Sequence, residues 1–141
     1  MMSDIIFYLV LSGMLTLLLW TPYIVARMVG WGIPTFLNNY PEGFPANSPE
    51  QPLWAERAQR AHLNMVETMP AFIAVVAGSL LLPSSGEMGL VSVAYWSAVF
   101  FYARLVHAAV YILGVPFLRT PVYLVSWLAI LMIGFEVLAA V

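Results

Sequence analysis

The sequence predicts an all-α integral membrane protein, an antiparallel bundle of four transmembrane helices. Hydrophobic residues make up 62% of the 141-residue chain and charged residues only 9%, which is too little charge to cover a soluble globule of this size. The mean hydropathy is +0.90. Long apolar stretches, near the roughly 20 residues that a helix needs to cross a bilayer, recur along the whole chain. These observations favour one multi-pass domain over residues 1–141.

Four spans are expected at about residues 5–26, 56–82, 88–113 and 120–141. The first carries no charge, and a secretory signal is the weaker interpretation because Asp4 precedes it without a basic residue and no small-residue cleavage site follows. The second is apolar only in its later part, so it crosses only if the polar segment before it also enters the membrane. The third and fourth each hold one charged residue within the span, Arg104 and Glu136.

A long proline-rich loop is expected over residues 27–55, because proline removes a backbone donor and breaks helices. If the spans alternate, Arg27, Arg57, Arg60 and Arg119 all fall at one membrane face. The positive-inside rule then places the long loop in the cytoplasm and both termini outside.

Composition also excludes several functions. The net charge of -2 and the lack of a basic run argue against nucleic acid as a partner. Cysteine is absent, so disulfides, thiolate metal sites and a cysteine nucleophile are excluded. No metal site is expected, since there are only two histidines and His62 lies five residues from Glu67, on another face of a helix.

Polar residues inside the spans form three stripes at helical spacing. Charged groups at this depth cost roughly 2.5–3.5 kcal/mol and are usually functional or paired. In the second span the stripe covers an arc of about 80°. The stripes consist of Arg57, Arg60, Asn64 and Glu67 in the second span, Arg104, His107 and Tyr111 in the third, and Arg119 and Tyr123 in the fourth.

Two interpretations of the stripes remain open. Guanidinium groups bind carboxylates in bidentate geometry, so arginines that converge on one pocket would suit a small ligand with several carboxylates. A thiol on that ligand would lose its proton more easily beside an arginine. In the alternative, Arg57 or Arg60 forms a buried ion pair with Glu67 that holds the helices together. For Arg104 a structural role is favoured, as a partner of Glu67 across helices.

The motifs resemble those of the MAPEG family, the membrane-associated proteins in eicosanoid and glutathione metabolism. The segment ERAQRAHLNMVETMP resembles the family pattern E-R-x-x-R-A-x-x-N-x-x-E-x-x-P. The pattern R-x-x-H-x-x-x-Y follows at Arg104, His107 and Tyr111, and then LRTPVY with Arg119 and Tyr123. The departures are Leu63, where some members carry an arginine, and His107, where others carry tyrosine.

The resemblance implies a bacterial-type member that forms a homotrimer, lies in the bacterial inner membrane, and binds glutathione as co-substrate between protomers near the cytoplasmic surface. Arg119 would be the catalytic residue that stabilises the glutathione thiolate. An apolar second substrate would enter from the membrane lipids. The residues implied in glutathione binding are Arg27, Arg60, His62, Asn64, Glu67, His107, Tyr111 and Tyr123.

The expected function is therefore that of a membrane-embedded glutathione-dependent transferase or peroxidase acting on lipophilic electrophiles. The alternative is a non-catalytic protein, either a lipid-binding scaffold or a small subunit of a larger membrane complex. A proton or ion pathway is less favoured, because the half of the bilayer away from the arginines offers only Glu136.

Overall fold

The computed structural model describes residues 1–38, 50–82 and 87–141. Within these ranges the chain is helical, with short turns and no strand. The helices are α1 (Met2–Leu18), α2 (Thr21–Trp31), α3 (Ile33–Leu37), α4 (Leu53–Leu81), α5 (Glu87–Leu113) and α6 (Arg119–Ala139).

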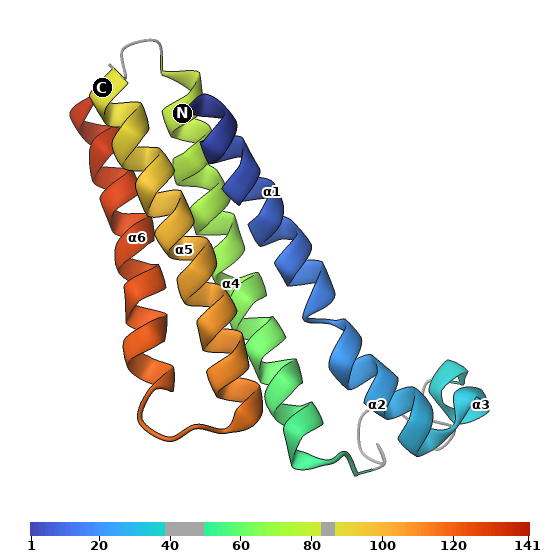
Figure 1. Cartoon of the computed structure of the whole chain (residues 1–141). Helices are drawn as coiled ribbons and strands as arrows, with labels where there is room; N and C mark the ends of the chain where they lie inside the picture. The colour runs from blue at the N-terminus through green and yellow to red at the C-terminus, as the bar shows by residue number, and fades with distance from the viewer. Residues whose placement is uncertain (39–49, 83–86) are drawn as a thin grey trace.

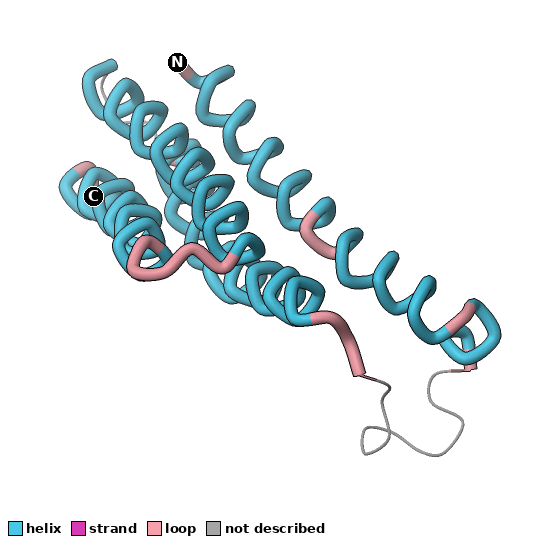
Figure 2. The backbone as a smooth tube through the Cα atoms, turned by 60° about the horizontal axis from the view of Figure 1, so that its bottom comes forward, coloured by secondary structure: helices cyan, strands magenta, loops and turns pink. Residues whose placement is uncertain are grey.

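Four helical segments are long and apolar enough to cross a membrane: Met2–Trp31, Leu53–Leu81, Gly89–Leu113 and Arg119–Ala139. They run up and down in an antiparallel bundle, and the two termini lie at the same end (Figure 1). Figure 2 shows α1 and α2 as one rod along the side of the group formed by α4, α5 and α6. The prediction of an all-α, multi-pass bundle of four spanning helices is confirmed.

The first span differs from the single uninterrupted helix that the sequence suggested. The helix is interrupted at Leu19 and Trp20, between α1 and α2. Pro22, in the first turn of α2, has no N–H to donate to the Leu18 carbonyl. The hydroxyl of Thr21 donates to that carbonyl instead, at 2.8 Å. The break therefore has a local cause, and the two helices still form one span.

The predicted loop over residues 27–55 is wrong at both ends. At its start α2 continues to Trp31, and α3 follows after Gly32, whose φ of 79° ends the helix. Pro34 lies in the first turn of α3, where the missing N–H costs no hydrogen bond. At its end α4 already begins at Leu53. The middle of the expected loop, residues 39–49, lies outside the described residues.

The second span is one continuous helix, α4, which includes both the polar and the apolar halves of the segment. Pro70 lies inside it without ending it, as is tolerated in transmembrane helices where neighbouring groups satisfy the freed backbone. The polar stretch therefore enters the span together with the apolar one. This continuity places the polar stripe of the second span next to α5 and α6.

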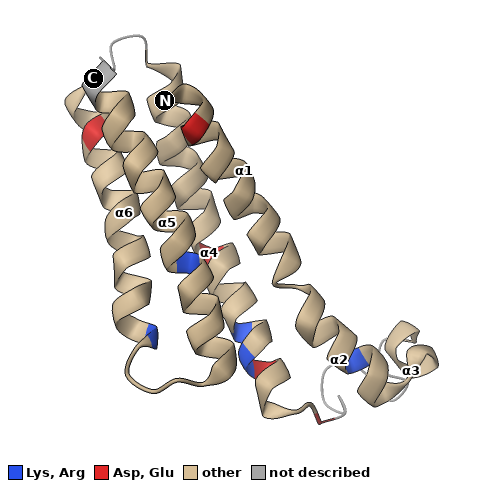
Figure 3. Ribbon diagram, viewed as in Figure 1, with Lys and Arg blue, Asp and Glu red and all other residues tan. Residues whose placement is uncertain are grey.

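The charges are distributed unequally along the bundle. Figure 3 shows every basic position in the half that contains α2, the start of α4 and the α5–α6 connection. At the other end, where the termini lie, the described helices carry acidic positions only (Figure 3). The prediction that the arginines lie toward one end of the bundle is confirmed.

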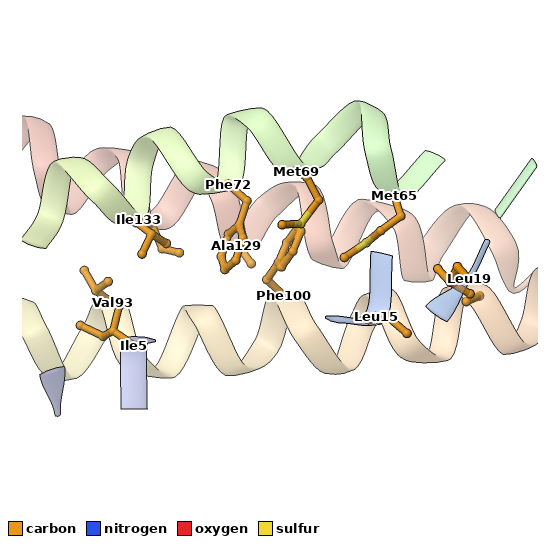
Figure 4. Close-up of a cluster of buried hydrophobic side chains, with 12 residues drawn as sticks. Ile5, Leu15, Leu19, Met65, Met69, Phe72, Val93, Phe100, Ala129 and Ile133 are labelled. Carbon is orange, nitrogen blue, oxygen red and sulfur yellow. The ribbon is translucent and has the colours of Figure 1, made fainter. Parts of the chain in front are cut away.

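The core that holds these helices in place is built from apolar side chains of α1, α4, α5 and α6 (Figure 4). At its centre the ring of Phe72 stacks on that of Phe100, with centroids 3.9 Å apart and an interplanar angle of 13°. Ile5 and Ile133, from the first and last spans, are also fully buried. Many large apolar residues outside this core are exposed, among them Phe7, Leu17 and Phe135. These outward apolar surfaces suit contact with lipid or with other membrane helices.

Candidate functional site

Two adjoining cavities lie where the start of α4 faces the end of α5 and the start of α6. They share Arg57, Tyr111 and Arg119, and they enclose about 260 Å³ and 130 Å³. We refer to the two together as the arginine pocket. The larger is further lined by Val110, Gly114, Val115, Pro116, Phe117 and Thr120. The smaller is further lined by Leu53, Glu56 and Arg60.

Three arginines from two different spans converge on this pocket. Arg57 and Arg60 are one helical turn apart on α4, and Arg119 is the first residue of α6. The guanidinium carbon of Arg119 lies 5.0 Å from the centre of the Tyr111 ring, a cation–π distance. Arg60 and Arg119 are exposed, so the pocket is open to its surroundings.

Gly114 gives the guanidinium group of Arg57 its place. The residue ends α5 with a φ of +69°, a conformation that favours glycine. A Cβ at this position would overlap Nη1 of Arg57 and lie 2.5 Å from its Cζ. A residue without a side chain at position 114 therefore leaves the space that the Arg57 guanidinium occupies at the edge of the pocket.

Among the described residues, no carboxylate neutralises the arginines of the pocket. Across residues 1–38, 50–82 and 87–141, the one ion pair joins the N-terminal amine to Asp4. Glu56 lines the smaller cavity without pairing, and Glu67 is exposed. The interpretation in which Glu67 forms a buried ion pair with Arg57 or Arg60 is therefore contradicted. The pocket has an excess of positive charge and the geometry to receive an anion.

Arg104 lies deeper and is 1% exposed. Its Nη2 donates to the carbonyl oxygen of Asn64 at 2.7 Å and to the hydroxyl of Thr68, both on α4. Its Cζ lies 5.0 Å from the centre of the Tyr123 ring on α6. The expected pairing with Glu67 is not found; a backbone carbonyl and a hydroxyl take its place, and Arg104 ties three helices together.

His107 connects this buried arginine to the pocket. It is 3% exposed, and its ring centre lies 5.6 Å from that of Tyr111 and 5.8 Å from that of Tyr123. Tyr111 in turn lines both cavities of the arginine pocket. The stripes predicted for the third and fourth spans therefore meet in the structure.

Two of the predicted glutathione ligands lie elsewhere, at the contact between α2 and α4. The hydroxyl of Tyr23 is 3.0 Å from Nδ1 of His62, and Nη2 of Arg27 donates to Oε1 of Gln59 at 2.9 Å. His62 follows Arg57 by five residues, which turns it about 140° around the helix and away from the arginine pocket. Within one chain, His62 and Arg27 are therefore not brought to the pocket.

The other two predicted ligands on α4, Asn64 and Glu67, do not line the arginine pocket. The side-chain amide of Asn64 donates to the carbonyl of Arg60 at 2.9 Å, within its own helix. Glu67 is exposed. Sequence reasoning placed Arg57 in the polar stripe but left it out of the ligand set, although its three-residue spacing to Arg60 was the available signal. Nothing in the sequence pointed to Gly114.

Comparison with known proteins gives one result. A search of curated proteins and a search of solved structures found no match. A family model does match, over residues 5–139, and so covers nearly the whole of the 141-residue chain. The chain therefore belongs to the MAPEG family and is an integral, multi-pass membrane protein of that family of glutathione and eicosanoid metabolism.

Proposed function

We propose that the protein is a glutathione-dependent transferase or peroxidase that acts on lipophilic electrophiles within the membrane. The observation that carries the proposal is the arginine pocket, in which Arg57, Arg60 and Arg119 surround an open cavity without a carboxylate partner among the described residues. Glutathione suits such a pocket because it carries two carboxylates and a thiol. Guanidinium groups bind carboxylates through paired, charge-assisted hydrogen bonds.

Arg119 is the residue proposed to activate the thiol. It is the first residue of α6, its Cζ lies 5.0 Å from the centre of the Tyr111 ring, and its exposed side chain lines the pocket. A cation next to a thiol lowers the thiol pKa, so more of the bound glutathione is thiolate at neutral pH. In the transferase reaction the thiolate sulfur attacks an electrophilic carbon and forms a C–S bond, while the leaving group departs with the electron pair of the bond that breaks. In the peroxidase reaction the sulfur attacks the outer oxygen of a hydroperoxide, the O–O bond breaks to release the alcohol, and a second glutathione converts the resulting sulfenic acid to glutathione disulfide and water. Arg57 and Arg60 hold the carboxylates and orient the sulfur.

The proposed active assembly is a homotrimer with glutathione between protomers. The predicted ligands fall on two sides of α4, with Arg60 facing α6 and His62 facing α2. A neighbouring protomer that packs along α4 would bring the α2–α4 side of one chain to the arginine pocket of the next. His62, Arg27 and Glu67 would then contribute to the site in trans. The arginine-rich end, with the glutathione site, is proposed to face the cytoplasm of a bacterium.

The proposal is tested by titrating the purified protein in a non-ionic detergent with glutathione and following the ultraviolet absorption of the bound thiolate. The wild type is expected to bind and to show the thiolate band. Arg119→Ala is expected to lose the band and keep its oligomeric state by size-exclusion chromatography, while Arg119→Lys, which retains a charge, keeps part of it.

Two results would contradict the proposed enzymatic function. Glutathione binding without a thiolate band in the wild type would favour a non-catalytic scaffold. No binding at millimolar glutathione would remove the glutathione function altogether.

A further inference from the structure

A further cavity, with a largely apolar lining, lies at the opposite end of the bundle, near the termini. It encloses about 710 Å³ between α5 and α6 and is lined by Gly89, Val91, Ser92, Tyr95 and Glu136. The hydroxyl of Ser92 donates to Oε1 of Glu136 at 2.7 Å. Glu136 is half-buried in an otherwise largely apolar lining. A carboxylate is thus held in a fixed position inside a span.

Within the part of the chain that the structure describes, this carboxylate has no cationic partner. The sequence has no lysine, and all five arginines lie in the other half of the bundle (Figure 3). The two histidines lie with the arginines, on α4 and on the second half of α5. The N-terminal amine is at the same end as Glu136 but pairs with Asp4 at 2.8 Å. A carboxylate inside a span is costly unless it is protonated, reaches water or meets a cation, so the position favours a cation supplied from outside the chain.

Tyr95 connects the cavity to an apolar groove on the same pair of helices. The groove encloses about 490 Å³, and the small side chains of Ala98 and Ala103 leave room at its floor. It follows α5 from Tyr95 to Val106, about 16 Å of helix. Its other walls are formed by Val99, Tyr102, Val122 and Val125.

We propose that the Glu136 cavity binds the ammonium group of a single-chain cationic amphiphile, whose apolar chain lies in the groove between α5 and α6. The Glu136 carboxylate supplies the opposite charge, and the exposed ring of Tyr95 supplies a face for cation–π contact. A zwitterionic phospholipid fits less well, because no basic residue lies at this end to receive its phosphate. The Glu136 cavity is at the far end of the bundle from the arginine pocket, the groove runs from it toward the start of α6, and binding there does not depend on glutathione.

The test uses the full-length protein in phosphatidylcholine nanodiscs and tritiated dodecyltrimethylammonium as the probe. Saturable binding is expected, with competition by unlabelled probe and at least tenfold weaker competition by dodecyl maltoside and dodecyl sulfate, which share the chain but not the charge. Equal competition by all three would overturn the proposal, since the groove alone would then explain binding. Displacement of the probe when phosphatidylethanolamine replaces phosphatidylcholine would also overturn it, because the site would then be a phospholipid site.

Two variants locate the site. Glu136→Gln keeps the shape of the side chain and is expected to raise the Kd of the probe about tenfold or more, which is the effect of losing a partly buried charge pair. Asp4→Asn removes a carboxylate at the same end that already has a partner, so the Kd is expected to change less than about twofold. Equal Kd values for the wild type and Glu136→Gln would contradict the proposal. Head-group selectivity in the wild type decides the question even if the variant fails to fold.

Discussion

Replacing Gly114 by alanine tests whether the position of the Arg57 guanidinium determines glutathione binding. The added Cβ would overlap Nη1 of Arg57 and lie 2.5 Å from its Cζ, whereas an ordinary contact begins near 3.4 Å. The guanidinium carbon must therefore move by about 1 Å. Because this atom is at the far end of a flexible side chain, the helices can stay in place while the cation leaves the edge of the arginine pocket.

Two magnitudes follow from this geometry. An L-residue in the left-handed region at the φ of Gly114, +69°, costs about 1–2 kcal/mol of stability. A hydrogen bond to a charged group contributes about 1.5–3 kcal/mol, and each 1.4 kcal/mol is a factor of ten in affinity. We therefore expect Gly114→Ala to weaken glutathione binding roughly 10- to 100-fold and to lower the free energy of unfolding by about 1–2 kcal/mol.

The assay is glutathione titration of the wild type, Gly114→Ala, Arg57→Met and the double variant, together with unfolding in denaturant. Once Arg57 is replaced, Gly114→Ala is expected to weaken binding no further, although its cost in stability remains. Gly13→Ala serves as the control, because nothing lies within 4 Å of the added Cβ there. Additive losses of affinity in the double variant, or normal binding by Gly114→Ala, would refute this account of the pocket.

Two further substitutions test the polar contacts that join the helices. Thr68→Val removes one of the two acceptors of the buried Arg104 and is expected to lower the free energy of unfolding by about 1.5–3 kcal/mol. Thr16→Val, whose hydroxyl bonds only within its own helix, is the matched control, and equal effects would show that the contact with Arg104 contributes nothing. Tyr23→Phe removes the hydroxyl that contacts His62. The lost hydrogen bond is expected to cost about 0.5–1.5 kcal/mol, and hydrogen exchange of the α2 amides should therefore be roughly two- to tenfold faster. Unchanged exchange in α2 would show that this contact does not hold α2 against α4.

The polar contacts also divide the predicted site into two groups. One group, around Arg119 and Tyr111, is assembled within a single chain. The other, around His62 and Arg27, faces α2. A site that needs both groups requires a second copy of the chain, so the oligomeric state is part of the functional proposal. If the protein proved to be monomeric in lipid nanodiscs and still formed the thiolate, His62 and Arg27 would have no role as ligands.

Sequence alone determined the spans, the end of the bundle that holds the arginines, and the family. Each depends on a property that is local or periodic. A helix of about 20 apolar residues is long enough to span a bilayer, whatever it packs against. Residues three or four apart share a face in any helix. Arg104, His107 and Tyr111 therefore share one face of α5, and in the structure this face meets the start of α6. The predicted bounds of the loop were wrong because proline disfavours helix interiors but is tolerated in the first turn of a helix. The spacing of the prolines did not show where the first turn of α3 or the start of α4 would be.

Only the tertiary structure decided which groups pair. Arg104 could have met Glu67 but instead bonds the backbone of Asn64 and the hydroxyl of Thr68. Arg57 lies in the pocket because Gly114, in the turn directly after α5, leaves it room. These pairings depend on the distance and rotation between helices, which are set by packing in the core and not by spacing along the chain. A helical pattern fixes which side chains share a face; what that face meets is fixed only when the helices pack.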